Sequence, residues 1–175
     1  NILSGLFLVL SMAVCAQNPP LETGLDIGSP GIPGKSTYDY NNQAYTLTGS
    51  GENIWGERDA FYFQHTRLEG DFILRARVDF VGKGTHPHRK IGWMIRKSLD
   101  QDAPHVSAAL HGDGLVSLQY RKLKGSMTGE IRSDDQAPDI LQLERRGNVY
   151  IMSTARFGEP FTTVVLDTLG EGEGP

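Results

Sequence analysis

Short segments in which apolar and polar residues alternate recur along the chain from residue 43 to residue 166. They are rich in β-branched and aromatic residues and are separated by Gly, Asp, Asn or Pro, which is typical of strands joined by turns. No helical pattern interrupts them, so the sequence predicts an all-β sandwich or barrel in one domain. The predicted strands are residues 43–49, 60–66, 71–80, 89–96, 105–112, 115–122, 139–146, 148–156 and 161–166. Gly-Asp-Gly at 112–114 and Arg-Gly-Asn at 146–148 predict hairpin turns between neighbouring strands.

Alternation divides the four consecutive segments between residues 71 and 121 into an apolar and a polar face. The apolar face, predicted to be the core, includes Phe72, Leu74, Trp93, Leu110 and Leu118. The polar face holds the candidate ligand-binding residues Arg75, Arg77, Arg96, His105, His111, Gln119 and Arg121. Small residues lie between them, so we expect a concave, solvent-exposed surface with room above Gly92, Ser107, Ala109 and Ser117.

The two tryptophans have different predicted roles. Trp93 alternates with Ile91 and Ile95, which places it in the core. Trp55 lies between glycine-bearing turns, where it could stack on a sugar or close one end of the sandwich. Because the neighbouring Ile54 also needs burial, the second role is favoured.

The first residues have the pattern of an export signal. Residues 1–16, "NILSGLFLVLSMAVCA", are uncharged, too short in their apolar block to span a bilayer, and end in small residues that a signal peptidase recognises. We therefore expect an incomplete signal peptide over 1–16, a mature domain over 17–175, and a secreted or periplasmic location. A buried N-terminal helix is one alternative. A lipid-anchored Cys15 is another, which the bulky Val14 before it disfavours.

Composition narrows the function classes. Cys15 is the only cysteine, so the mature domain has neither disulfides nor thiolate metal sites. A net charge of −4 argues against general nucleic-acid binding, and no second apolar stretch approaches transmembrane length.

The histidines of "GTHPHRKIGWMIRKS" (84–98) raise the question of a metal site. Pro87 separates His86 from His88 and cannot donate to a strand ladder, so the pair is expected in a loop. His105 and His111 lie about 20 Å apart along one strand face and cannot both join that pair. The sequence predicts no metal site and no cofactor.

Catalytic patterns are also lacking. The Glu-x-Asp-x-x-Glu strand pattern of β-glucan hydrolases is absent, and the nearest carboxylates, Glu52, Glu57 and Asp59, have the wrong spacing. No Gly-x-Ser-x-Gly elbow surrounds a serine. No catalytic residue is predicted.

An ordered series of motifs resembles a known domain type. "LDIGSPGIPGKSTYD", "YTLTGSGENIWGERDAFYF", "GDFILRARV", "KIGWMIRKSL", "PHVSAALHGDGLVSLQYR" and "LQLERRGNVYIMSTA" are similar to concanavalin-A-like sandwiches of the laminin-G and "regulation of enolase" type. The resemblance is closest to the N-terminal domain of secreted bacterial Tol-type biopolymer transporters, and it implies a jelly-roll sandwich followed by a β-propeller. It also implies closing strands after residue 166, so we expect a fragment truncated at the C-terminus.

Two function classes follow. The first is an exported, non-catalytic accessory module that binds carbohydrate or another cell-envelope polymer through the polar face. The second is a structural or assembly domain that packs on a downstream β-propeller, with the polar face only solvated. Glycoside hydrolysis ranks below both.

Overall fold

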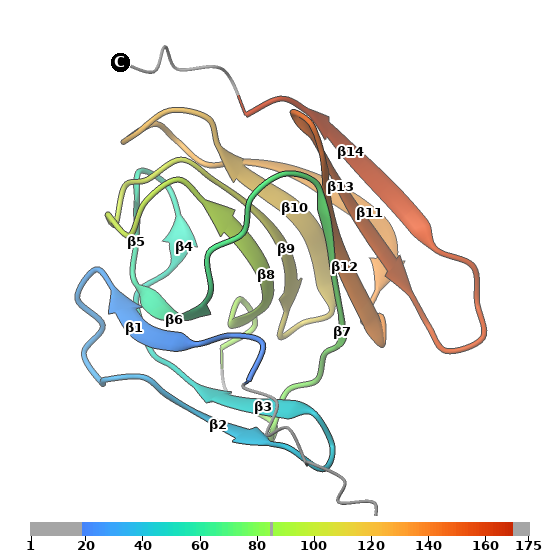
Figure 1. Cartoon of the computed structure of the whole chain (residues 1–175), viewed down its shortest axis with the longest axis horizontal. Coiled ribbons are helices and arrows are strands. Elements are labelled where there is room, and N and C mark those ends of the chain that lie inside the picture. The colour runs from blue at the N-terminus through green and yellow to red at the C-terminus, as the bar shows by residue number, and fades with distance from the viewer. Residues whose placement is uncertain (1–18, 85, 170–175) are drawn as a thin grey trace, which may run out of the picture.

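The computed structural model describes residues 19–84 and 86–169, which form β-strands and no helix. The prediction of an all-β domain is confirmed, while the predicted signal peptide lies outside the described residues. Two four-stranded antiparallel sheets form the body of the molecule (Figure 1). The first sheet, in the order β11–β10–β9–β8, comprises β8 (Lys90–Arg96), β9 (His105–His111), β10 (Leu115–Arg121) and β11 (Gly129–Gln136). The second, in the order β14–β13–β12–β7, comprises β7 (Phe72–Arg77), β12 (Ile140–Arg146), β13 (Val149–Ala155) and β14 (Thr162–Asp167).

The N-terminal third of the described chain forms three two-stranded pairs beside the first sheet (Figure 1). Tyr62 links two of these pairs, because its hydroxyl donates to Ser36 Oγ over 3.3 Å. The pairs are β1 (Thr23–Ile27) with β6 (Phe61–His65), β2 (Lys35–Asp39) with β3 (Ala44–Thr48), and β4 (Ile54–Trp55) with β5 (Arg58–Asp59). None of the described residues forms a helix long and apolar enough to cross a membrane.

All the predicted strands are present, as β3, β6 to β10 and β12 to β14. The sequence did not reveal β1, β2, β4, β5 and β11. The sequence of β11, "GEIRSDDQ", contains Ile131 as its only large apolar residue, so alternation cannot mark it. It is a strand because it pairs with β10, a long-range interaction that leaves no local pattern.

The two sheets pack face to face over a shared apolar core, as in a β-sandwich. Val106, Leu110 and Leu118 contribute from the first sheet, and Leu143 and Met152 from the second. Trp93 packs against this cluster, and its indole N–H donates to Leu141 O over 3.1 Å, which confirms its predicted core position.

Both predicted hairpin turns are confirmed. Gly114 lies between β9 and β10 with φ 94°, and Gly147 lies between β12 and β13 with φ 56°. Side chains with a Cβ disfavour these left-handed angles, which explains the two glycines.

The prediction that four consecutive strands share one polar face is wrong for β7, which lies in the other sheet. This strand pairs with β12 in the second sheet, with Leu74 opposite Leu143. The chain then crosses to the first sheet to begin β8. Alternation still gives the correct sides of β7, since Leu74 is more buried than the exposed Arg75 and Arg77.

Candidate functional site

The outer face of the first sheet, which we call the polar face, carries four cross-strand rows of side chains. The antiparallel register places Arg96 opposite His105 and Lys90 opposite His111, at the two ends of β8 and β9. Strands β10 and β11 extend these rows. The rows are Arg96, His105 and Arg121; Met94, Ser107, Gln119 and Glu130; Gly92, Ala109, Ser117 and Arg132; and Lys90 with His111.

At the first end, Asp59 of β5 inserts into a buried ionic cluster. Arg121 binds its carboxylate in a bidentate manner, with Nη2–Oδ1 at 2.7 Å and Nη1–Oδ2 at 2.9 Å. Arg96 Nη1 lies 3.4 Å from Oδ2, and His105 Nε2 lies 4.0 Å from Oδ1. The side chains of Asp59, His105 and Arg121 are fully buried. This cluster fixes the β4–β5 hairpin to the sheet.

Burial controls the charges here. It lowers the pKa of Arg96, and the nearby Asp59 offsets only part of this effect. Burial also lowers the pKa of His105 to about 4, so its imidazole is neutral near pH 7, and neither ring nitrogen has a hydrogen-bond partner. The expectation that this face meets solvent is therefore wrong for all five candidate residues on it. His105, His111, Gln119 and Arg121 are buried, and the side chain of Arg96 is 2% exposed.

The centre of the polar face holds a hydrogen-bonded chain. The Gln119 amide donates to Glu130 Oε1 over 3.0 Å and lies 3.3 Å from His111 Nε2. His111 Nδ1 lies 3.0 Å from Leu115 O, and burial lowers the pKa of His111. Burial of Glu130 raises its pKa, but Arg132, Gln119 and the nearby Ser117 hydroxyl outweigh this effect and hold it below its usual value.

One row carries only short side chains on three strands, and we call it the small-residue row: Gly92, Ala109 and Ser117. It lies between the row of Met94, Ser107, Gln119 and Glu130 and the row of Lys90 and His111. Gly92 is exposed to solvent, whereas Ala109 and Ser117 are buried. A Cβ on Gly92 would lie 1.9 Å from Ala108 O, so only glycine fits here. Two buried polar atoms beside the row have no hydrogen-bond partner, Ser107 Oγ and Gln119 Oε1, and Ser117 Oγ has only the nearby Glu130 carboxylate.

Lys90 lies next to the small-residue row on β8, two residues before Gly92. Its Nζ donates to Asn53 Oδ1 over 2.9 Å and to Ile54 O over 2.8 Å. The Trp55 ring centroid lies 5.6 Å away. Trp55 is 39% exposed, so the prediction that it closes an end of the sandwich is wrong. Hairpin β4–β5 therefore places an aromatic ring beside the Lys90 cation of β8.

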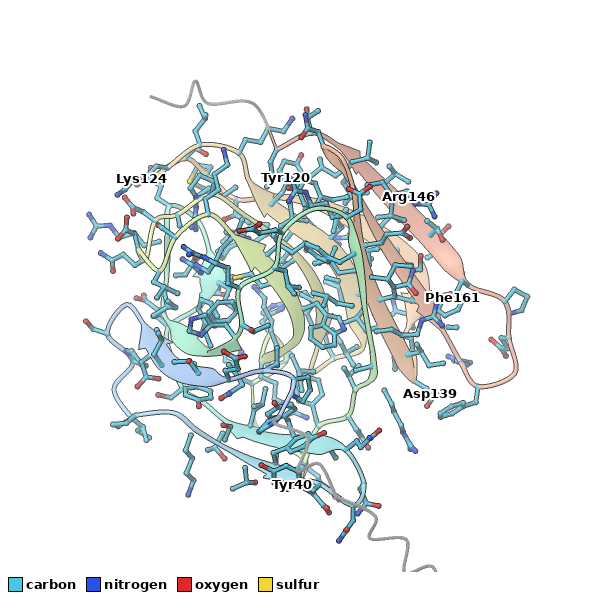
Figure 2. The ribbon with its side chains drawn as sticks, viewed as in Figure 1. Tyr40, Tyr120, Lys124, Asp139, Arg146 and Phe161 are labelled. Carbon is cyan, nitrogen blue, oxygen red and sulfur yellow. The ribbon has the colours of Figure 1, made fainter. Side chains whose placement is uncertain are left out.

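Arg75 and Arg77 lie elsewhere, on the outer face of the second sheet. Arg75 donates to Gln142 Oε1 over 2.7 Å and lies 5.1 Å from the Phe161 ring centroid. The guanidinium carbon of Arg77 lies 5.3 Å from the Phe157 ring centroid. Phe161 is far from Lys124, which follows β10 (Figure 2). The seven predicted site residues thus separate into a group of five on the polar face and a pair on the opposite sheet.

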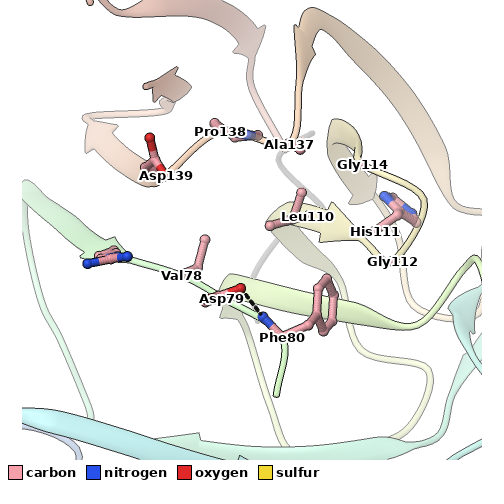
Figure 3. A pocket seen from close by; sticks show the side chains of 11 residues that line it. Val78, Asp79, Phe80, Leu110, His111, Gly112, Gly114, Ala137, Pro138 and Asp139 are labelled. Atoms are coloured by element: carbon pink, nitrogen blue, oxygen red, sulfur yellow. Dashed lines mark hydrogen bonds between the residues drawn. The ribbon is translucent and has the colours of Figure 1, made fainter. Parts of the chain in front are cut away.

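A cavity of about 190 Å³ opens between the two sheets at the end of β7 (Figure 3). Val78, Phe80 and Leu110 supply its apolar lining. Its carboxylates are already engaged, because Asp79 accepts from Phe80 N and Asp139 accepts from Phe157 N. The cavity is smaller than the usual ligand pocket of about 300–1,000 Å³.

The loop histidines approach the polar face without forming a metal site. The ring centroids of His86 and His88 are 5.8 Å apart, and those of His88 and His111 are 6.2 Å apart. Among residues 19–84 and 86–169, no group of three His, Cys, Asp or Glu side chains is placed to hold a metal ion.

Sequence reasoning missed three site residues. Alternation already places Lys90 on the polar face of β8, together with Arg96, so its position could have been predicted. Glu130 lies on β11, which shows no alternation. Asp59 lies 62 residues from Arg121, and nothing local indicates their pairing.

No family profile matches the chain, and no curated protein or solved structure gives a significant match.

Proposed function

We propose that the protein is a non-catalytic module that binds carbohydrate or another hydroxyl-rich extracytoplasmic polymer at the small-residue row. The unpartnered Ser107 Oγ and Gln119 Oε1 support this proposal above all. Buried polar atoms in folded proteins nearly always have partners, so unpartnered atoms beside one row support the binding of a hydroxyl group there.

The chemistry of the row suits hydroxyl groups. A sugar hydroxyl both donates and accepts hydrogen bonds, and a serine hydroxyl can act as its acceptor or its donor. Gln119 Oε1 offers an acceptor, and the exposed part of Trp55 offers a stacking surface. Access to Ser117 requires movement of the flanking side chains, such as that of Arg132, which is 69% exposed.

We also propose the finer fold and setting that the sequence resemblance implies: a concanavalin-A-like jelly roll in a secreted or periplasmic protein. The crossover from β7 in the second sheet to β8 in the first supports this proposal, because such crossovers link the layers of double-sheet folds. A solved structure whose strand connections differ from a jelly roll would overturn it.

The experiment is affinity electrophoresis and calorimetry with a panel of soluble polysaccharides. Trp55→Ala should abolish retention, and Ser117→Ala should weaken binding about fivefold, as expected for one lost hydrogen bond. Phe161→Ala is the matched control, because Phe161 is 42% exposed on the other sheet. Loss of binding in Phe161→Ala alone would place the site on the second sheet, and no retention by any polysaccharide would reject the proposal.

The second candidate function is a structural domain that docks on a β-propeller or similar partner. The outer face of the second sheet favours it, because this face exposes apolar side chains over several strands and the loop before β14. The exposed fractions are 56% for Ile73, 47% for Val165, 42% for Phe161 and 61% for Phe157. Exposed apolar patches of this kind mark interaction surfaces. Binding of a partner that Ile73→Asp abolishes would support this role.

A further inference from the structure

Lys90 is a half-buried cation whose hydrogen-bond partners are neutral. Its ammonium contacts the Asn53 amide oxygen and the Ile54 carbonyl at 2.9 and 2.8 Å, and faces the Trp55 ring. Within the described residues, no carboxylate oxygen lies within 4.0 Å of Nζ.

The other cations of the polar face are paired. Arg121 and Arg96 share the Asp59 carboxylate, and Arg132 Nε lies 2.8 Å from Glu130 Oε2. Buried and half-buried charges are normally paired, so an ammonium without a carboxylate in direct contact, at the edge of a polar site, indicates a place for an anion.

The electrostatics of Lys90 agree with this geometry. Burial lowers its pKa to about 8, although the more distant Glu130 and Asp59 act to raise it. The amine therefore remains mostly protonated at neutral pH but is poorly solvated. An anion that binds it would compensate the charge and raise the pKa again.

We propose that Lys90 binds the anionic group, a carboxylate or a sulfate, of an acidic saccharide whose hydroxyl groups occupy the small-residue row. This inference rests on the proposed function and names its ligand class. Lys90 precedes Gly92 by two residues on the same face of β8, so their Cα atoms are about 7 Å apart along the strand. One bound saccharide segment can thus contact both.

The experiment compares two matched pairs of polymers by calorimetry: polygalacturonate with its carboxyl-reduced form, and dextran sulfate with dextran. At pH 6.5 the wild-type protein should bind the acidic member of at least one pair about tenfold more tightly. This preference should disappear in Lys90→Gln and persist in Lys35→Gln, since Lys35 is exposed on β2. The pair that shows the preference identifies the anionic group.

The preference should also fall as the pH rises well above 8, because Lys90 then loses its charge. A direct readout that needs no variant is the ¹⁵N chemical shift of Lys90 Nζ. The acidic polymer should raise its titration midpoint above about 8, and its neutral counterpart should not.

The outcomes separate the two proposals. Equal binding of acidic and neutral members would overturn the role of Lys90 and leave carbohydrate binding in place. A preference that survives in Lys90→Gln, or an unchanged Nζ titration, would overturn the role as well. Binding of none of the four polymers, and of no other polysaccharide, would reject the proposed function itself.

Discussion

At the residue scale, the decisive feature is the carboxylate of Asp59. It compensates two guanidinium groups that have almost no access to water, with side chains 2% exposed for Arg96 and fully buried for Arg121. Such a cluster is not strong evidence for high stability, since desolvation offsets much of the attraction. Breaking it is costly, however, because the remaining charges stay buried.

We therefore predict that Asp59→Asn lowers the free energy of unfolding by about 3–5 kcal/mol. Urea denaturation followed by tryptophan fluorescence measures this loss. Asp100→Asn is the control, because Asp100 forms an exposed ion pair with Lys124 and should leave the melt almost unchanged. Equal effects of the two changes would show that the Asp59 cluster is not a structural tie.

At the scale of elements, the hairpins fix the register of the second sheet. Strands β12 and β13 are joined by two residues, with Arg146 opposite Val149. Gly147 takes the first of these positions with φ 56°, where a type II′ turn requires glycine. Because side chains alternate between faces, a slip of one residue would move Leu143 from the core to the surface.

Gly147→Ala tests this turn. No atom lies within 4 Å of an added Cβ, so the cost comes from the backbone alone and should be about 1–2 kcal/mol. Gly31→Ala is the matched control, because its Cβ also meets no atom within 4 Å and its φ is not in the left-handed region. We expect the control to be neutral or slightly stabilising in thermal melts. A neutral Gly147→Ala would contradict the turn.

At the scale of the whole molecule, the chain forms three layers: the second sheet, the first sheet and the N-terminal pairs. The first sheet lies between the apolar core and the N-terminal pairs, and its outer face is buried over β9 and most of β10, whereas Gly92 on β8 is exposed. His105 lies in the buried part. Burial is the main cause that lowers its pKa, Asp59 acts to raise it, and Arg121, Arg96 and Lys90 lower it further. Folding must therefore depend on pH.

We predict that stability falls as the pH drops from 6.5 to about 4. In this range the unfolded chain protonates His105, whose unperturbed pKa is 6.5, whereas the folded imidazole stays neutral down to about 4. The loss attributable to His105 can reach about 3 kcal/mol and is absent above pH 6.5. His105→Gln should flatten the dependence of the melting temperature on pH in this window. The exposed His88→Gln should not, and the same slope in both variants would contradict the prediction.

The alternation of residues determined much of this fold by itself. It identified the strands that form most of both sheets, the core position of Trp93, and the face that His105, His111, Gln119 and Arg121 share. It also placed Lys90 on that face. These properties are local, because the side of a strand on which a residue lies depends only on the period of two and on the neighbours in sequence.

Only the tertiary structure decided which sheet each strand joins and what covers each face. Strand β7 looks like a neighbour of β8 in sequence but pairs with β12, which removed Arg75 and Arg77 from the candidate site. Strand β11 owes its existence to β10, and with it came Glu130. The row of Arg96, His105 and Arg121 looks exposed in the sequence, but in the structure it forms a buried cluster with Asp59. Strand pairing and burial depend on contacts between residues distant in the chain, and such contacts leave no periodic signal in either partner.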